Sequence, residues 1–166
     1  TGRSACSRSI CSIRERGTIN RMSTRMPTIA YIGLGSNMGD KRANCRKALE
    51  LLDSAGRVLT VSSFYCTEPV GYREQETFIN AVAAVETDLP PDVLLAACHR
   101  IEEQMGRTRE LRWGPRPLDL DILLYGERVV DEPDLAIPPP RLALRRFALL
   151  PLAEIAPQAM HPVLKK

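Results

Sequence analysis

The chain has 166 residues, of which 44% are hydrophobic and 26% are charged, so it is long enough for one soluble globular domain with its own core. No apolar run approaches the roughly 20 residues that a membrane-spanning helix needs, and the presence of only two histidines argues against a zinc site. The formal net charge of +3 arises in residues 1–26, where six arginines and one glutamate give +5; the rest of the chain carries −2, which argues against a general polyanion-binding surface.

The N-terminal segment differs in composition from the rest of the chain. Residues 1–26 are rich in serine, arginine and threonine and have no sustained apolar period, so we expect a disordered extension ahead of a domain over residues 27–166. The composition fits an organellar transit peptide, or sequence translated ahead of a start at Met22 or Met26, and we favour the second. The five cysteines are odd in number and form no Cys-x-x-Cys pair, which favours a reducing cytoplasm.

The apolar periodicity of residues 27–166 predicts the secondary structure. Alternating apolar and β-branched residues indicate strands, and apolar residues at i, i+3, i+4 and i+7 indicate helices. In chain order, the expected elements are a strand over 28–34, a helix over 41–53, strands over 57–66 and 78–87, a helix over 90–106, a strand over 118–125, a proline-rich connection over 131–140 and a helical segment over 141–155. The order of strands and helices is the β-α-β-β-α-β ferredoxin-like pattern, so we expect an α+β fold with helices on one face of an antiparallel sheet.

A glycine-containing loop is expected after the first strand. The segment Gly33–Asp40 approaches a dinucleotide-binding fingerprint, but Met38 stands where Gly-x-Gly-x-x-Gly needs its third glycine. The chain also has no Gly-Lys-Ser or Gly-Lys-Thr element and so no P-loop. The alternative is that the loop is a tight turn followed by an asparagine or aspartate helix cap.

Two aspartates alternate with apolar residues in the strand expected at 118–125. Because strand side chains point to opposite faces in turn, Asp119 and Asp121 lie on the same face, roughly 7 Å apart along the strand. Two such carboxylates repel each other unless a cation lies between them or one takes up a proton. Mg²⁺ prefers carboxylate oxygens and fills its remaining positions with water and substrate phosphates, so the pair is a candidate magnesium site.

Four arginines and the only tryptophan lie just before this aspartate pair. Guanidinium groups match phosphate oxygens, and an indole offers a flat face to an aromatic ring. Arginines near carboxylates more often make surface salt bridges, and Asp-x-Asp on a strand is common. Together, however, the features indicate a polyphosphate held by cations from two directions. The residues concerned are Arg107, Arg109, Arg112, Trp113 and Arg116.

The sequence Arg-Trp-Gly-Pro-Arg-x-Leu-Asp-Leu-Asp-Ile, beginning at Arg112, closely resembles the signature of the 6-hydroxymethyl-7,8-dihydropterin pyrophosphokinases. The similarity extends from about Ile29 to Pro162. It implies a monomeric, ATP-dependent enzyme of folate biosynthesis that uses two Mg²⁺ ions. Such an enzyme transfers the β,γ-pyrophosphoryl group of ATP to the hydroxymethyl oxygen of the dihydropterin and releases AMP. Neither a nucleic acid nor a membrane is expected as a partner.

The resemblance also implies roles for individual residues. The residues that it assigns to catalysis are Arg107, Arg116, Asp119 and Asp121, with both aspartates as metal ligands. The residues that it assigns to ATP are Leu95, His99, Glu102, Arg109, Arg112, Ile122 and Arg145. The residues that it assigns to the pterin are Thr67, Val70, Phe78, Asn80, Trp113 and Phe147, with the last two stacking on its ring.

Some of these positions have another interpretation or depart from the family. From the sequence alone, His99 and Glu102 would be surface residues near the end of a helix. Where the family often has a histidine that contacts the nucleotide, this chain has Pro139, which has no N–H to donate. We therefore expect weaker ATP binding or compensation by His99.

Two other functions fit parts of the sequence. The aspartate pair alone would fit another Mg²⁺-dependent phosphoryl or nucleotidyl transferase on a ferredoxin-like sheet, but Trp113 and Asn80 favour a planar aromatic acceptor. A ferredoxin-like sheet can also bind RNA, but RNA readers expose aromatic residues on their central strands. Here Asp119 and Asp121 would instead repel the phosphate backbone.

Overall fold

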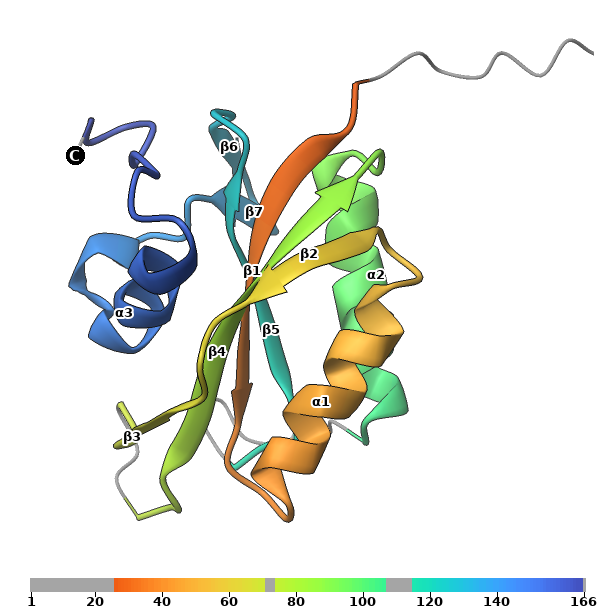
Figure 1. The fold of residues 1–166 in the computed structure, drawn as a ribbon, viewed down its shortest axis with the longest axis vertical. Coiled ribbons are helices and arrows are strands. Elements are labelled where there is room, and N and C mark those ends of the chain that lie inside the picture. The colour runs from red at the N-terminus through yellow and green to blue at the C-terminus, as the bar shows by residue number, and fades with distance from the viewer. Residues whose placement is uncertain (1–25, 71–73, 107–114, 166) are drawn as a thin grey trace, which may run out of the picture.

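The computed structural model describes residues 26–70, 74–106 and 115–165 of the chain (Figure 1). Its centre is an antiparallel five-stranded sheet in the order β2-β4-β1-β5, with β3 also paired to β4. The strands are β1 (Thr28–Ser36), β2 (Arg57–Val61), β3 (Tyr65–Thr67), β4 (Phe78–Thr87) and β5 (Asp119–Tyr125). The α+β fold is confirmed, and the strand order is consistent with the ferredoxin-like pattern.

Two helices cover one face of the sheet. Helix α1 (Lys41–Leu52) begins where the Asp40 side chain accepts a hydrogen bond from the N–H of Ala43 at 3.0 Å. Helix α2 (Pro91–Gln104) begins with proline, whose missing N–H would have no partner in a first turn. The apolar faces of both helices bury the main hydrophobic core against the sheet.

The third helix was expected on the same face, and this expectation is wrong. Helix α3 (Arg146–Ile155), preceded by a 3-10 turn η1 (Leu142–Leu144), packs on the opposite face (Figure 1). It buries a second, smaller apolar cluster that includes Val82, Leu123 and Leu152. The sheet is therefore covered on both faces, and α3 forms one wall of any site on its own side.

Two other segments differ from the expected elements. The single strand expected over 57–66 is interrupted between β2 and β3, because Ser62 uses its hydroxyl as well as its N–H to bond Val82. The connection expected over 131–140 contains a short hairpin, β6 (Val130–Glu132) and β7 (Leu135–Ile137), whose second strand is anchored by buried Leu135 and Ile137.

The N-terminal extension lies almost entirely outside the described residues, so its expected disorder stays a prediction. Met26, the first residue described, is 87% exposed. Within the part of the chain that the structure describes, no helix is long and apolar enough to span a membrane.

Candidate active site

The predicted site residues of the sheet, except Ile122, lie on the face that α3 covers. Gly35 of β1 lies directly opposite Asn80 on one side and Asp119 on the other. Directly paired residues of antiparallel strands point to the same face, so Asn80, Gly35 and Asp119 form a row across β4, β1 and β5. In the next row, Gly33 lies opposite Asp121. The alternation read from the sequence is therefore confirmed: the two carboxylates share a face.

Gly35 forms the floor between the two halves of this row. A Cβ atom at this position would lie 3.0 Å from Asn80 Oδ1 and 3.8 Å from both Asp119 Cβ and Phe78 Cδ1. Glycine thus leaves space between these three side chains. The first strand was expected to end at Leu34, with Gly35 in the loop, but β1 continues to Ser36 and places Gly35 inside the sheet.

Each aspartate of the pair lies beside an arginine from a different segment. Arg116 Nη2 is 3.2 Å from Asp119 Oδ2, and Arg145 Nη1, at the start of α3, is 3.8 Å from Asp121 Oδ2. The Arg116 guanidinium also lies over the Phe78 ring, 5.7 Å from its centroid. Its Nε atom is buried and has no hydrogen-bond partner among the described residues. A buried donor without an acceptor lowers the stability of the fold. An anionic ligand that bound Arg116 would supply the missing acceptor.

Three of the residues assigned to the pterin share this face. Thr67, Phe78 and Asn80 point the same way, because Thr67 pairs with Phe78 and Asn80 is two residues along the same strand. The Asn80 amide Nδ2 donates a hydrogen bond to the Thr67 hydroxyl at 2.6 Å. Phe147 packs from α3 against the apolar cluster on this face, whereas Val70 is 65% exposed. Asn80, which could have been an exposed strand residue, is instead 8% exposed.

Several residues assigned to ATP lie on the other face of β5, toward α2. Ile122 is 4% exposed and belongs to the main core, and Leu95 packs against that core. His99 is half-buried on the same helix. Because β5 is the last strand in the order β2-β4-β1-β5, a ligand touching both sets of residues would have to pass over this edge of the sheet.

Glu102 is not the surface residue that the sequence alone suggested. It is 2% exposed, and its Oε1 accepts a hydrogen bond from the N–H of Leu120 at 2.7 Å. Leu120 separates the two aspartates, so the Glu102 carboxylate holds the backbone that presents them. The pKa of the neighbouring Cys98 thiol is raised to about 12. Burial of the thiol is the largest cause, and the negative charge of Glu102 is the next.

Asn37 is a residue that sequence reasoning did not single out. It is 2% exposed, its N–H donates to the Arg116 carbonyl at 3.2 Å, and its Oδ1 accepts from the Arg116 N–H at 2.9 Å. Its Nδ2 donates to Gln75 Oε1 at 2.9 Å and to the Glu76 carbonyl at 3.3 Å. Asn37 therefore ties the segment before β4 to the segment before β5. For this loop the sequence predicted a tight turn with an asparagine or aspartate helix cap. The cap is Asp40, so the helix-cap pattern did not indicate the role of Asn37.

Four predicted site residues, namely Arg107, Arg109, Arg112 and Trp113, lie outside the described residues, and their roles stay predictions. Within the described ranges there is no cluster of three or more histidine, cysteine, aspartate or glutamate side chains that could hold a metal ion. Asp119 and Asp121 alone supply two hard oxygen ligands on one face. This donor set fits Mg²⁺, which commonly takes one or two carboxylates and completes its shell with water and substrate phosphates.

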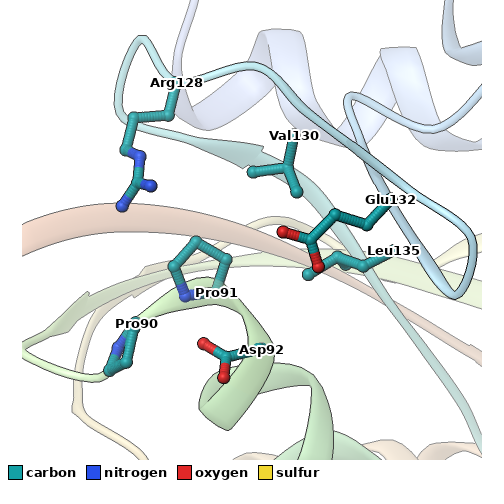
Figure 2. A pocket seen from close by; sticks show the side chains of 7 residues that line it. All are labelled: Pro90, Pro91, Asp92, Arg128, Val130, Glu132 and Leu135. Carbon is teal, nitrogen blue, oxygen red and sulfur yellow. The ribbon is translucent and has the colours of Figure 1, made fainter.

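A small pocket lies away from this face, between the start of α2 and the β6–β7 hairpin (Figure 2). Its volume is about 110 Å³. None of the residues that line it belongs to the predicted site. The lining residues are Pro90, Pro91, Asp92, Arg128, Val130, Glu132 and Leu135.

Comparison with known proteins identifies the family of the chain. The sequence profile of the 7,8-dihydro-6-hydroxymethylpterin-pyrophosphokinase (HPPK) family matches residues 31–157. The 2-amino-4-hydroxy-6-hydroxymethyldihydropteridine pyrophosphokinase of Bacillus subtilis is 48% identical over 135 residues, which cover 80% of this chain and 81% of the relative. The enzyme of the same name from Pseudomonas aeruginosa is 44% identical over 134 residues, covering 80% and 83%.

A solved structure shares the fold at lower identity. A Plasmodium falciparum HPPK-DHPS variant with SDX-DHP superposes with a TM-score of 0.70 at 18% identity, over 87% of this chain and 45% of that one. This likeness concerns the fold alone, and the chain spans less than half of that protein. The profile match and the two bacterial relatives decide the assignment: the chain belongs to the HPPK family.

Proposed function

We propose that the chain transfers the pyrophosphoryl group of ATP to 6-hydroxymethyl-7,8-dihydropterin, and that the row Asn80–Gly35–Asp119 is where acceptor and donor meet. The family assignment supports the reaction. The observation that carries the location is that Gly35 pairs with Asn80 on one side and Asp119 on the other. Two strand spacings of about 4.8 Å separate the amide from the carboxylate by roughly 10 Å. A pterin held at Asn80 therefore directs its hydroxymethyl group toward the aspartates.

The acceptor is recognised by an amide held in one orientation. The hydrogen bond from Asn80 Nδ2 to the Thr67 hydroxyl fixes the amide plane before substrate binds. A pterin edge carries both donors and acceptors, which a fixed amide can match in a defined orientation. Phe147 from α3 and Trp113 would stack on the two faces of the ring.

The arginines hold the phosphates. Arg116 can keep its contact with Asp119 through Nη2 while its buried Nε donates to a phosphate oxygen. Arg145 reaches the same region from α3. Phosphoryl transfer depends mainly on positioning and charge stabilisation, so no side-chain nucleophile is needed. The hydroxymethyl oxygen attacks the β-phosphorus and passes its proton to an aspartate or a bound water, and the bond from that phosphorus to the oxygen of the α-phosphate breaks as AMP leaves.

Asp119 and Asp121 would hold two Mg²⁺ ions, and bound Mg²⁺ neutralises triphosphate charge and orients the reacting groups. Their proximity to Arg116 and Arg145 does not exclude this role, because an ionised carboxylate has two oxygens with about four lone-pair sites and can bind an arginine and a metal ion together. We further propose that the chain acts as a monomer, since the row across β4, β1 and β5 and the start of α3 all come from one copy.

AMP release from ATP in Mg²⁺ tests the proposal, with and without 6-hydroxymethyl-7,8-dihydropterin. The wild type should release AMP only when the pterin is present. The Asp119→Ala variant should lose this activity, whereas Asp131→Ala, an exposed acid of the β6–β7 hairpin, should retain it. Absence of pterin-dependent AMP from the folded wild type, or full activity of Asp119→Ala, would refute the proposal.

A further inference from the structure

The interruption between β2 and β3 contains one extra residue. Val61 at the end of β2 lies opposite Ala83, and Tyr65 at the start of β3 lies opposite Asn80. Residues 62–64 thus face only residues 81–82 of β4, which is the geometry of a β-bulge. A bulge changes which side chains of the following strand point to each face of the sheet.

Ser62 joins the bulge to β4 of the sheet. Its N–H donates to the Val82 carbonyl at 2.9 Å, and its hydroxyl accepts from the Val82 N–H at 2.9 Å. The same hydroxyl donates to the Ser63 carbonyl at 2.9 Å. The Ser62 hydroxyl therefore replaces a backbone carbonyl as the acceptor for the Val82 N–H. The extra residue of the bulge is accommodated without leaving this N–H unpaired.

From the other side, Glu154 of α3 holds the bulge and the first residue of β3. Its carboxylate accepts from the Ser63 N–H at 3.0 and 3.1 Å, from the Ser63 hydroxyl at 2.9 Å and from the Tyr65 hydroxyl at 2.7 Å. The bond from Tyr65, followed by those from Ser63, lowers the pKa of Glu154, so the carboxylate is ionised at neutral pH. All three groups are donors, and an ionised carboxylate is the side chain that only accepts.

The bulge decides which residue of β3 faces the pterin row. With it, Tyr65 pairs with Asn80 and Thr67 with Phe78, so Thr67 faces the site and bonds the Asn80 amide. Without the extra residue, β3 would shift by one position, and Cys66 would lie opposite Phe78 in place of Thr67. A one-residue shift turns every side chain of a strand to the other face.

We propose that Glu154 is a positioning residue for acceptor recognition: by holding the bulge at residues 62–64, it keeps Thr67 on the site face and the Asn80 amide in its pterin-binding orientation. Glu154 itself does not touch substrate. It also joins β3 to α3, the helix that begins beside Arg145 and carries Phe147. The inference rests on the proposed function, because it assumes that Asn80 recognises the pterin.

Steady-state kinetics of the full chain test the inference through the variant Glu154→Gln. Glutamine has the same size as glutamate, but its –NH₂ group is a donor and cannot accept a hydrogen bond. At least one of the donors from Ser63 and Tyr65 therefore loses its acceptor, and the bulge is held less firmly. We expect the KM for the pterin to rise about fivefold, the size of one net hydrogen bond, with the KM for ATP unchanged. Glu50→Gln is the matched control, because Glu50 is an exposed acid on α1 whose one salt bridge among the described residues is to Lys47. It should change neither constant.

Two further variants separate positioning from general destabilisation. Tyr65→Phe removes one of the donors and should raise the pterin KM in the same direction. In an Asn80→Ala background, Glu154→Gln should add no further increase, because its effect passes through the Asn80 amide. Unchanged pterin KM in both Glu154→Gln and Tyr65→Phe, or a full additional increase in the Asn80→Ala background, would overturn the inference while leaving the proposed function intact. A folded wild type without pterin-dependent activity would overturn both.

Discussion

Replacing Gly35 by alanine should separate stability from acceptor binding. The new Cβ atom would lie 3.0 Å from Asn80 Oδ1, closer than ordinary van der Waals contact, so the amide must move by a few tenths of an ångström. The amide is already engaged at 2.6 Å with the Thr67 hydroxyl, so this movement strains the bond that orients it. Gly35 does not have a positive φ, and alanine in its place gains about 0.5–1 kcal/mol from lower backbone entropy in the unfolded chain.

We therefore expect Gly35→Ala to unfold at the same temperature as the wild type or higher, yet to bind the pterin more weakly. Loss of one well-oriented hydrogen bond corresponds to roughly fivefold in KM for the pterin. Gly33→Ala is the matched control, because the three atoms nearest to a Cβ atom there all belong to the flexible Leu123 side chain, at 3.4 to 3.5 Å. The two variants would be compared by thermal unfolding and by pterin-dependent AMP release.

Equal pterin KM values for Gly35→Ala and the wild type would refute the role of Gly35 as the floor of the site. The same conclusion would follow if Gly33→Ala impaired pterin use as strongly as Gly35→Ala, since the atoms nearest to a Cβ atom at Gly33 belong to Leu123 and not to Asn80 or Phe78.

Three further predictions concern single residues. At pH 8, a thiol reagent should modify exposed Cys66 but not Cys45 or Cys98 in the folded protein, because burial raises their pKa values to about 11 and about 12; mass spectrometry of the peptides would show this. Asn37→Ala should lower the free energy of unfolding by about 2–3 kcal/mol in urea titration, since it removes a buried side chain that bonds two segments. Arg116→Lys should keep the charge but lose the Nε donor, and kcat should fall roughly 100-fold.

Each of these predictions has an outcome that contradicts it. Modification of Cys98 at the rate of Cys66 would mean that α2 opens in the native state. An unfolding free energy of Asn37→Ala within 0.5 kcal/mol of the wild type, about the usual effect of a surface substitution, would remove its role as a link between segments. Wild-type kcat in Arg116→Lys would show that a point charge suffices and that Nε contacts no phosphate.

The sequence predicted those parts of the fold that depend on local periodicity. The alternation around Asp119 and Asp121 placed both carboxylates on one face, because the side-chain period of a strand is two and does not depend on its neighbours. The boundaries of β4 were predicted as observed, since Phe78–Thr87 is apolar or β-branched at every position except Asn80 and Glu86.

The parts that were missed depend on contacts between distant segments. No local pattern shows that Glu154 would reach Ser63, 91 positions earlier, and allow a bulge inside a run that reads as one strand. Glu102 looked like a surface acid because its partner, the N–H of Leu120, belongs to a strand 18 positions later. The sequence also did not indicate which face of the sheet α3 covers, because the apolar residues of this helix could pack against either face.

If the acceptor and the reacting phosphates meet across Gly35, variants on its two sides should impair different steps of the reaction. Pterin binding would be measured in Mg²⁺ with a non-hydrolysable ATP analogue, and AMP release with ATP, for Asn80→Ala and Asp119→Ala. We predict that Asn80→Ala weakens pterin binding about tenfold, whereas Asp119→Ala keeps most of its pterin binding but releases no AMP. Wild-type pterin affinity in Asn80→Ala, or wild-type AMP release by Asp119→Ala, would contradict this arrangement of the site.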